Sequence, residues 1–364
     1  MKRAEPAEPA ALNQTLIGRD ADVAALLPHL DAAADGAGAT VVLVGAGGVG
    51  KTRLAETLAD EARHRGFRIA AGRAFRVEAG VPYALFADAF MPVIRELKPA
   101  VLAALTRGAQ AELSVILPGL GAAARLHSDD PAELRSRLLW TVTEFVHALA
   151  ARQPLLLLLD DVHWADLSSL HLLHFLARQT AQARVLILCT YNETERGQRP
   201  ELRSLEESLF TLGLAHVHNV RPFTRDETDE LIRRAFGADD RVTHDFSTLL
   251  YGWTRGNVFF VRETLQSLVD SGRLRRREDG QWLGWDFADL ELPGSIREVI
   301  ISRLGYLSPA ARSAADTAAV IGTRFDHDLL RYALPLAERE LLGAIDELRR
   351  LHIILESTAS GELR

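Results

Sequence analysis

Residues 40–52 read TVVLVGAGGVGKT, an aliphatic run followed by a glycine-rich turn that ends in Lys51-Thr52. The apolar run is short enough for a buried strand. The next segment, RLAETLADEARHRG (53–66), has helical spacing and a helix stop at Gly66. A G-x-x-x-x-G-K-T pattern between a strand and a helix is typical of a phosphate-binding loop. The stretch therefore predicts nucleotide binding by an α/β domain with a parallel sheet.

The glycine-rich turn also predicts which groups hold the nucleotide. Glycines let successive backbone N–H groups turn inward around phosphate oxygens, where a Cβ atom would block the approach. The start of the following helix adds partial positive charge. We expect Lys51 to neutralise the β and γ phosphates and the Thr52 hydroxyl to bind Mg²⁺. The predicted nucleotide contacts of this loop are Gly45, Gly47, Gly48, Val49, Gly50, Lys51 and Thr52.

The same letters also spell G-x-G-x-x-G, the pattern of a dinucleotide-binding turn. That interpretation requires an acidic residue at the end of the next strand, about 20 residues further on. The predicted next strand, FRIAAGRAF (67–75), has Arg73 there and no carboxylate. A dinucleotide-binding turn also leaves Lys51-Thr52 without a role, so we reject this interpretation.

A second informative stretch is LLLLLDDVHWAD (155–166), in which a strongly apolar strand ends in two aspartates. In open α/β sheets, ligands bind at the carboxyl ends of the strands. We therefore assign Asp160 to the Mg²⁺ side, through water, because Mg²⁺ loses its water reluctantly. Asp161 is assigned to orienting or deprotonating the attacking water. The alternative is that both aspartates cap the next helix, and His163 and Trp164 are expected to pack beside the site.

Strand and helix signals alternate to about residue 220, which predicts a parallel sheet. The chain then changes to helices, an Asp279-Gly280 hairpin signal and short amphipathic helices. The predicted fold is α/β, a parallel-sheet P-loop NTPase domain followed by a helical lid and a winged-helix domain. The predicted domains are a flexible tail (1–15), the NTPase domain (16–221), a helical lid with a hairpin (222–290), and a winged-helix domain truncated in its wing (291–364).

Composition excludes several classes of protein. The 364 residues have 42 Lys and Arg against 49 Asp and Glu, a net charge of −7, which disfavours a chain that coats nucleic acid or an anionic membrane. The single cysteine, Cys189, allows no intramolecular disulfide. The first residues, MKRAEPAEPAALNQ, lack the apolar core of a signal peptide. We therefore expect a cytoplasmic protein without a membrane partner.

Further stretches make a resemblance specific. They are IGRD (17–20), VPYALFADAF (81–90), VLILCTYNET (185–194), VRPFTRDETDELI (220–232), TRGNVFFVRETL (254–265) and LPGSIREVIISRLGYLSPAARSAADTAAVIGTRFD (292–326). Together with the two motifs above, they resemble the STAND branch of AAA+-related P-loop NTPases. Within that branch they look like the ATPase part of large LuxR-family (LAL-type) transcriptional regulators. The resemblance covers about residues 16–356, and similar modules occur in adenylate cyclases and kinase-linked regulators.

The resemblance implies ATP or ADP with Mg²⁺, bound between the α/β domain, the lid and the winged helix. It implies adenine contacts from the backbone of Ile17 and the side chain of Arg19, and places Gly256-Asn257-Val258 on the lid near the base. Thr190 and Asn192 would lie in the sensor 1 region near the γ-phosphate, with Asn192 in a catalytic role. It also implies self-association in the ATP state and DNA contact only through a C-terminal domain beyond Arg364.

Two departures from the resemblance predict slow hydrolysis. Relatives often have arginine where this chain has Asn192, and arginine stabilises charge on the leaving phosphate far better. They also tend to have proline where this chain has Val258, so a ring that packs on adenine is missing. We therefore expect binding with slow turnover.

Three hypotheses follow for the function. The first is a signalling switch driven by ATP and ADP, the regulatory ATPase part of a transcriptional regulator or of a cyclase- or kinase-linked one. The second is an oligomeric AAA+-type remodelling ATPase, which needs an arginine from a neighbouring subunit; Arg196, Arg199 and Arg203 are candidates. The third is DNA reading by residues 296–364, which their nine Lys and Arg against ten Asp and Glu disfavour.

Overall fold

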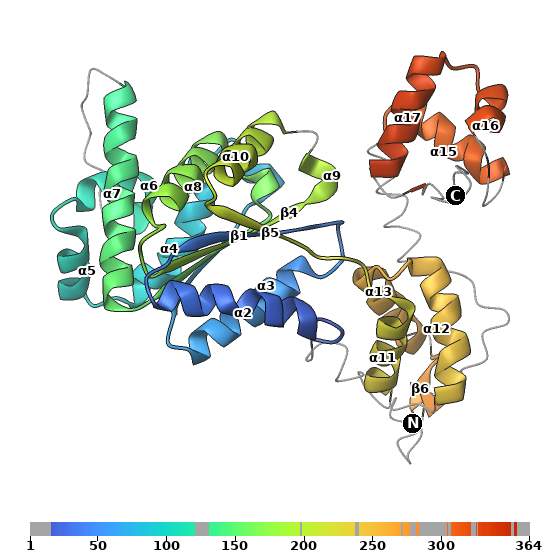
Figure 1. Ribbon diagram of the computed structural model, residues 1–364, viewed down its shortest axis with the longest axis horizontal. Coiled ribbons are helices and arrows are strands. Elements are labelled where there is room, and N and C mark those ends of the chain that lie inside the picture. Colours follow the sequence, from blue (N-terminus) through green and yellow to red (C-terminus); the bar gives the residue numbers. More distant parts are fainter. Residues whose placement is uncertain are drawn as a thin grey trace, which may run out of the picture. The chain divides into compact units, whose positions relative to one another are not determined.

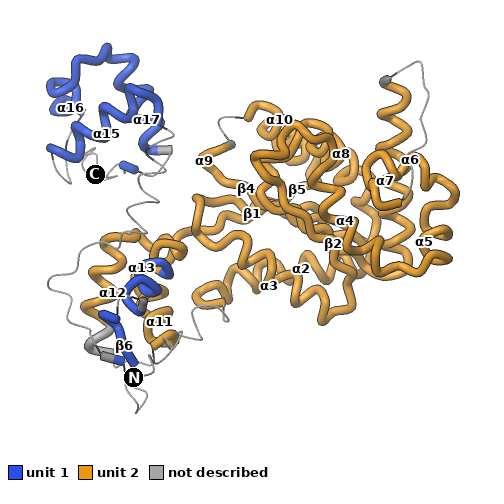
Figure 2. Tube along the Cα trace, turned by 180° about the vertical axis from the view of Figure 1, so that it is seen from behind, with its two compact units in different colours: residues 1–8, 262–364 blue, residues 9–261 orange. Residues whose placement is uncertain are grey.

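The structure is a computed structural model of the chain (Figure 1). It describes residues 16–120, 131–196, 199–236, 240–270, 272–276, 282–283, 304, 307–321, 325, 327–350 and 353–354. The chain divides into two compact units, residues 9–261 and residues 262–364 together with 1–8 (Figure 2). Each unit is described separately below. The predicted tail, 1–15, lies outside the described residues.

The larger unit is built on a five-stranded sheet in the order β2-β3-β4-β1-β5, with every neighbouring pair parallel (Figure 1). This confirms the predicted parallel-sheet α/β fold. The strand β4 lies between β1 and β3, so the ends of the two motif-bearing strands flank the end of β4. The strands are β1 (Ala39–Gly45), β2 (Arg68–Arg73), β3 (Leu155–Asp160), β4 (Val185–Asn192) and β5 (Ala215–Asn219).

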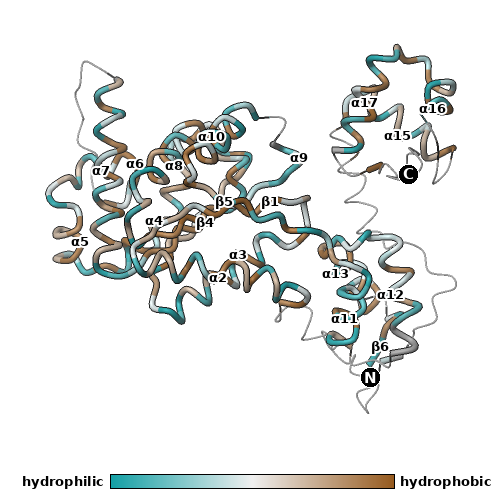
Figure 3. The backbone as a smooth tube through the Cα atoms, viewed as in Figure 1, coloured by the Kyte–Doolittle hydropathy of each residue, from teal (hydrophilic) through white to brown (hydrophobic). Residues whose placement is uncertain are grey.

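Both faces of this sheet are covered, which explains why its central strands are nearly continuous apolar runs (Figure 3). Alternate residues enter different cores, since successive side chains point to opposite faces. Leu155, Leu157 and Leu159 pack in the larger core with helices α4 (Ala84–Glu96), α7 (Pro131–Arg152) and α8 (Leu167–Gln179). Leu156 and Leu158 pack in the smaller core with α2 (Asp20–Ala34) and α3 (Lys51–His64).

The helices of the larger unit follow the predicted alternation with the strands. Their bounds are α2 (Asp20–Ala34), α3 (Lys51–His64), α4 (Ala84–Glu96), α5 (Pro99–Thr106), α6 (Gln110–Ile116), α7 (Pro131–Arg152), α8 (Leu167–Gln179), α9 (Glu193–Arg196), α10 (Pro200–Thr211), α11 (Arg225–Phe236) and α12 (Asp240–Thr254). Short 3₁₀ turns are η1 (Arg76–Glu78), η2 (Pro118–Leu120) and η3 (Val162–Trp164).

The sequence analysis does not predict the strand β5. Its residues, AHVHN, include two histidines and only one β-branched residue, because it is an edge strand with partly exposed side chains. It pairs with β1 from Thr40↔Ala215 to Val44↔Asn219. The predicted NTPase boundary near residue 221 therefore follows the last strand of the sheet.

The helices α11 and α12 belong to the larger unit, and the boundary between the units falls inside α13 (Val258–Asp270). The predicted lid, 222–290, is thus shared by both units, and its domain boundaries stay predictions. The predicted hairpin is present as the antiparallel pair β6 (Arg275–Arg276) and β7 (Trp282–Leu283). Its Asp279-Gly280 turn lies outside the described residues.

The described part of the smaller unit includes α15 (Pro309–Ile321), α16 (His327–Ala333) and α17 (Glu338–Arg350). Their apolar faces share one core that includes Ala311, Leu330 and Leu348. The Glu347 carboxylate accepts hydrogen bonds from the Ser308 amide at 2.8 Å and the Ser308 hydroxyl at 2.7 Å, which fixes the start of α15 against α17. The predicted linker at 291–295 lies outside the described residues, as does the predicted wing at 352–364 except for residues 353–354, so the winged helix stays a prediction. No helix in the described ranges has the length and apolar character needed to cross a bilayer.

Candidate functional site

The glycine-rich loop lies at the carboxyl end of β1 and leads into α3, as predicted. Gly48 and Gly50 adopt φ values of +84° and +100°, which favour glycine over any other residue. Gly48 also has no room for a side chain. A Cβ atom there would lie 2.6 Å from the Asn257 Oδ1 and 2.9 Å from the Phe259 Cβ. The loop is therefore held in one tight conformation by its own glycines and by the residues that cover it.

The backbone carbonyls of this loop accept hydrogen bonds from side chains and from one backbone amide. The Asn257 amide Nδ2 donates to the Gly47 carbonyl at 2.8 Å, and the Phe259 backbone N–H donates to the Gly48 carbonyl at 2.9 Å. Lys51 Nζ donates to the Gly45 carbonyl at 2.9 Å and to the Ala46 carbonyl at 3.0 Å. The Arg19 Nη2 donates to the Val49 carbonyl at 2.7 Å. All five carbonyls from 45 to 49 are thus satisfied by donors outside the loop backbone.

Arg19 connects the loop to the segment that follows β5. Its Nη2 donates to the carbonyls of Val49 and Arg221, each at 2.7 Å, and its Nη1 pairs with Asp22 at 3.1 Å. The side chain is only 2% exposed and its guanidinium lies 5.0 Å from the Phe223 ring centroid. The Arg19 guanidinium thus holds the loop against the segment that follows β5. Its predicted adenine contact stays a prediction, as does that of the backbone at Ile17, a residue that is itself buried.

Lys51 is a buried cation at the start of α3, with 7% of its surface exposed. Burial lowers its pKa, although the charges of Asp161, Asp160 and Glu193 act in the opposite direction. Carbonyl oxygens at 2.9 and 3.0 Å take up part of its hydrogen-bonding capacity. The ammonium group is therefore already positioned at the loop by residues of the chain itself.

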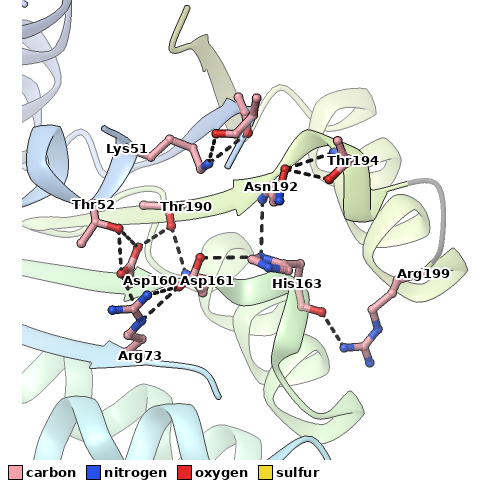
Figure 4. A network of polar contacts seen from close by, with 12 residues as sticks. Lys51, Thr52, Arg73, Asp160, Asp161, His163, Thr190, Asn192, Thr194 and Arg199 are labelled. Carbon is pink, nitrogen blue, oxygen red and sulfur yellow. Dashed lines mark hydrogen bonds and ion pairs between the residues drawn. The ribbon is translucent and has the colours of Figure 1, made fainter. Parts of the chain in front are cut away.

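The second motif places Asp160 at the end of β3, within reach of the loop (Figure 4). Thr52 Oγ1 lies 3.2 and 3.1 Å from the two Asp160 carboxylate oxygens. Thr190 Oγ1 donates to the Asp160 Oδ1 at 2.5 Å. Asp160 is only 7% exposed and Thr190 is fully buried. One carboxylate and one hydroxyl, both of the oxygen-donor type that Mg²⁺ prefers, thus face each other beside the loop.

Asp161 follows in a left-handed conformation, with φ +56°. Its backbone N–H donates to the Thr190 hydroxyl at 3.0 Å, so Thr190 orients both aspartates. Its carboxylate accepts two hydrogen bonds from Arg73, from Nε at 3.0 Å and from Nη2 at 2.7 Å. Partial burial opposes the charge on Arg73, but its bond to Asp161 and the Asp161 charge outweigh this and raise the pKa of Arg73. Asp161 is therefore engaged by a cation on its own chain.

The end of β4 completes the site (Figure 4). Asn192 pairs with Gly45 in the sheet register, which places it beside the first residue of the loop. Its Oδ1 accepts hydrogen bonds from the Thr194 N–H at 3.3 Å and the Thr194 hydroxyl at 3.0 Å. Its backbone N–H donates to the His163 Nδ1 at 3.4 Å. Burial, followed by the charge of Lys51, lowers the pKa of His163 to about 4, so this ring is neutral near pH 7.

The structure decides one alternative left open by the sequence. Helix α8 is capped by Asp166, whose side chain accepts a hydrogen bond from the Ser169 N–H at 2.9 Å. Asp160 lies within β3, and Asp161 makes no side-chain cap bond to the turn that follows. The helix-capping interpretation of these two aspartates is therefore wrong.

Three residues of this site make contacts that the sequence did not predict. Arg73 served only as evidence against a dinucleotide turn, yet it pairs with Asp161 at 2.7 Å. Its position at the end of β2, in register with Asp160, is a signal that could have identified it. Asn257 was placed on the lid near the base, and Phe259 was not considered. Their contacts with the loop join residues about 210 positions apart, which no local pattern reveals.

Comparisons with known proteins agree with this fold. Residues 15–188, just under half of the chain, match the family model described as an AAA ATPase domain. A Walker-type ATPase of Pyrococcus abyssi is similar over 97% of this chain and 96% of that chain, with a TM-score of 0.60 and 14% identity. At that identity the similarity concerns the fold alone. No curated protein matches the chain.

Two other solved structures show weaker similarity. A STAND protein with a tetratricopeptide repeat sensor from Pyrococcus horikoshii matches over 96% of this chain and 41% of that chain, with a TM-score of 0.38 and 12% identity. The Orc1 protein of Aeropyrum pernix, solved in complex with DNA, matches over 98% and 92%, with a TM-score of 0.44 and 18% identity. The family match and the fold together support a P-loop ATPase domain of AAA type within residues 15–188.

Proposed function

We propose that the chain is a signalling switch that binds ATP and ADP and hydrolyses ATP slowly with Mg²⁺. The observation that carries this proposal is the arrangement of the glycine-rich loop, in which all five carbonyls from 45 to 49 accept hydrogen bonds, two from the Lys51 side chain and three from Arg19, Asn257 and Phe259. Successive backbone N–H groups in a turn of this kind, ahead of a helix start, form an anion-binding concavity that suits a phosphate chain. Gly48 and Gly50 supply the backbone angles that this requires.

The remaining groups fit a magnesium nucleotide. Lys51 would neutralise the terminal phosphates, while Thr52 and Asp160, whose oxygens lie 3.1 Å apart, would hold the ion. When bound, Mg²⁺ would supply charge stabilisation at the phosphates. Thr190 holds the Asp160 carboxylate in place, so we assign Thr190 to orientation of this site as well as to the predicted sensor region.

Slow turnover is supported by the contacts of Asp161 and Asn192, the two residues with predicted catalytic roles. Asp161 is the group proposed to orient or deprotonate water, but Arg73 donates two hydrogen bonds to its carboxylate. A carboxylate that is bonded to a cation must exchange that partner before it can accept a hydrogen bond from water. Asn192 bonds to Thr194 through its side-chain oxygen and provides no charge for the leaving phosphate. Both features reduce catalysis and leave binding intact.

The resemblance to LAL-type regulators supports a regulatory rather than a metabolic role. In that view the ATP and ADP states differ in conformation, and attached domains respond to the difference. DNA contact by residues 296–364 is disfavoured because their charges nearly cancel, nine positive against ten negative. We therefore place any DNA contact outside this chain's own ATPase part.

The test combines nucleotide content, binding and turnover. Purified protein is denatured and the released nucleotide identified, and ATP and ADP binding is followed by calorimetry with excess Mg²⁺. Hydrolysis is then measured over a wide range of protein concentrations. We expect retained ADP, saturable binding of both nucleotides, and slow turnover whose rate per molecule is independent of concentration. Absence of saturable binding would refute the proposal, and turnover that rises steeply with protein concentration would favour the remodelling ATPase instead.

A further inference from the structure

We propose that Arg199 is a positioning residue for this ATPase site that acts within its own chain by holding the turn that carries Asp161. This inference rests on the proposed ATPase activity and adds a residue to its machinery. From the sequence alone, Arg199 was a candidate for an arginine that reaches the nucleotide of a neighbouring subunit. Its contacts in the structure indicate a different role.

The guanidinium of Arg199 is committed to two backbone carbonyls. Arg199 Nη1 donates to the His163 carbonyl at 2.7 Å (Figure 4). It also donates to the Ala165 carbonyl at 3.1 Å. His163 lies in the short 3₁₀ turn η3, which begins directly after Asp161, and Ala165 is the residue that follows this turn. Carbonyls at the end of so short a turn have no partner within the turn itself. Arg199 therefore supplies donors that the turn cannot provide.

The opposite side of the same turn is attached to β4. The His163 Nδ1 accepts a hydrogen bond from the Asn192 N–H at 3.4 Å. Helix α10, which begins directly after Arg199, is also attached to β4. There the Tyr191 hydroxyl donates to the Glu206 Oε1 at 2.6 Å, and both residues are buried. The turn is thus held between β4 and an arginine whose own position is fixed on β4.

Such support is needed because Asp161 adopts a left-handed backbone conformation, with φ +56°. A non-glycine residue in that region costs on the order of 1 kcal/mol and persists only when its surroundings hold it. Loss of Arg199 would let the turn relax and move the Asp161 carboxylate. A displacement of about 1 Å at a catalytic group can reduce turnover by a large factor. The contacts of the glycine-rich loop do not include Arg199, so nucleotide affinity should be spared.

The nearby arginines provide a contrast. Arg203 is exposed and pairs with Glu207 one turn further along α10, at 2.7 Å, without contacting the turn η3. It is therefore a matched control, with the same charge, in the helix that begins directly after Arg199. An arginine that serves a neighbouring subunit must be free to leave its own chain, whereas Arg199 is bonded to two carbonyls and half-buried.

The experiment compares Arg199→Ala, Arg199→Lys and Arg203→Ala with wild-type protein in nucleotide binding and single-turnover hydrolysis. We expect Arg199→Ala to reduce the hydrolysis rate about tenfold with ADP affinity within a factor of two, and Arg203→Ala to behave as wild type. Lysine keeps the charge but lacks the planar fork, so Arg199→Lys should recover part of the rate. Faster hydrogen exchange at the Trp164 and Ala165 amides should accompany the loss, because those amides form the bonds of the turn.

A mixing experiment separates the two roles of Arg199. Arg199→Ala protein, which keeps its loop, is mixed with Lys51→Ala protein, which keeps Arg199 but lacks the loop cation. A role within the chain predicts no recovery of hydrolysis, whereas an arginine acting across subunits predicts recovery. Two outcomes would overturn this inference without affecting the proposed function. They are recovery of hydrolysis in the mixture, and an unchanged hydrolysis rate in both Arg199 variants while the wild type hydrolyses ATP. If Arg199→Ala does not fold, the same outcomes are read from Arg199→Lys. A wild type without nucleotide binding would instead refute the proposed function.

Discussion

The glycine-rich loop and the turn after β3 lie on either side of the end of β4, yet they are prepared to different degrees. In the loop, every carbonyl from 45 to 49 already accepts a hydrogen bond, which holds the loop in one conformation before a ligand binds. In the turn, the Asp161 carboxylate is already occupied by Arg73 at 2.7 Å. The loop is preorganised for binding, whereas the Asp161 carboxylate in the turn is already paired with Arg73 of the same chain.

This difference separates affinity from turnover. Binding depends on a loop whose conformation is already fixed, and a preorganised loop does not pay for ordering when the ligand arrives. Hydrolysis depends on a carboxylate that must first exchange its partner. A protein built in this way binds nucleotide well and converts it slowly, which suits a switch better than a motor. The predictions below test each half of this contrast.

The largest effect is expected in the loop. Lys51→Ala removes the cation that neutralises the phosphates, and loss of one partner of a buried charge pair costs about 2–5 kcal/mol. We therefore expect ATP affinity to fall by about a hundredfold or more in a titration with a fluorescent ATP analogue. Arg53→Ala, on the exposed side of the same helix, is the matched control. Unchanged affinity in Lys51→Ala would show that the loop is not the binding site.

The two aspartates should separate binding from chemistry. Asp160→Asn removes the carboxylate that faces Thr52 and should weaken Mg²⁺-dependent ATP binding roughly tenfold or more. Asp161→Asn should leave binding nearly unchanged and slow hydrolysis by about tenfold to a hundredfold. Calorimetry with and without Mg²⁺, combined with single-turnover rates, measures both quantities. Equal loss of binding in the two variants would mean that their roles are wrongly assigned.

The two regions in this contrast could be predicted from the sequence, because each motif lies within one short stretch. The apolar runs of β1 and β3, the glycine-rich turn and the paired aspartates lie within short stretches, and their placement at one sheet edge follows from parallel pairing. The strand β5 was missed because AHVHN, at the sheet edge, has too little apolar character to stand out.

The contacts that Arg73, Asn257 and Arg199 make with the site could not be predicted in the same way. Arg73 meets Asp161 only because β2 pairs with β3 in a register that sets Arg73 opposite Asp160. Asn257 reaches the Gly47 carbonyl across 210 residues of chain. Arg199 bonds to carbonyls, and a carbonyl has no signature in a sequence. Long-range register and backbone acceptors decide these contacts, and neither is encoded in residue spacing.

A smaller effect is expected from Arg73. Its ion pair with Asp161 is half-exposed on the arginine side and contributes about 1 kcal/mol. Arg73→Gln should free the carboxylate and raise the hydrolysis rate about fivefold, with ATP affinity unchanged. Arg68→Gln, on the same strand and paired only loosely with Glu96 at 3.7 Å, is the control. A decrease in rate would show that Arg73 assists Asp161 instead of restraining it.

The smallest effect concerns the pH dependence of the turn that carries Asp161. The pKa of His163 is about 4 in the folded protein, against an ordinary value near 6.5. The unfolded chain therefore binds the extra proton first as the pH falls, and the free energy of unfolding declines from above pH 6.5 down to about pH 4. Between pH 7 and pH 6 this loss should be less than about 1 kcal/mol, measured by urea unfolding. His163→Asn keeps an acceptor for the Asn192 N–H and should flatten this slope. An unchanged slope in His163→Asn would show that this ring is not held neutral, and that the turn is supported mainly by Arg199 and Thr190.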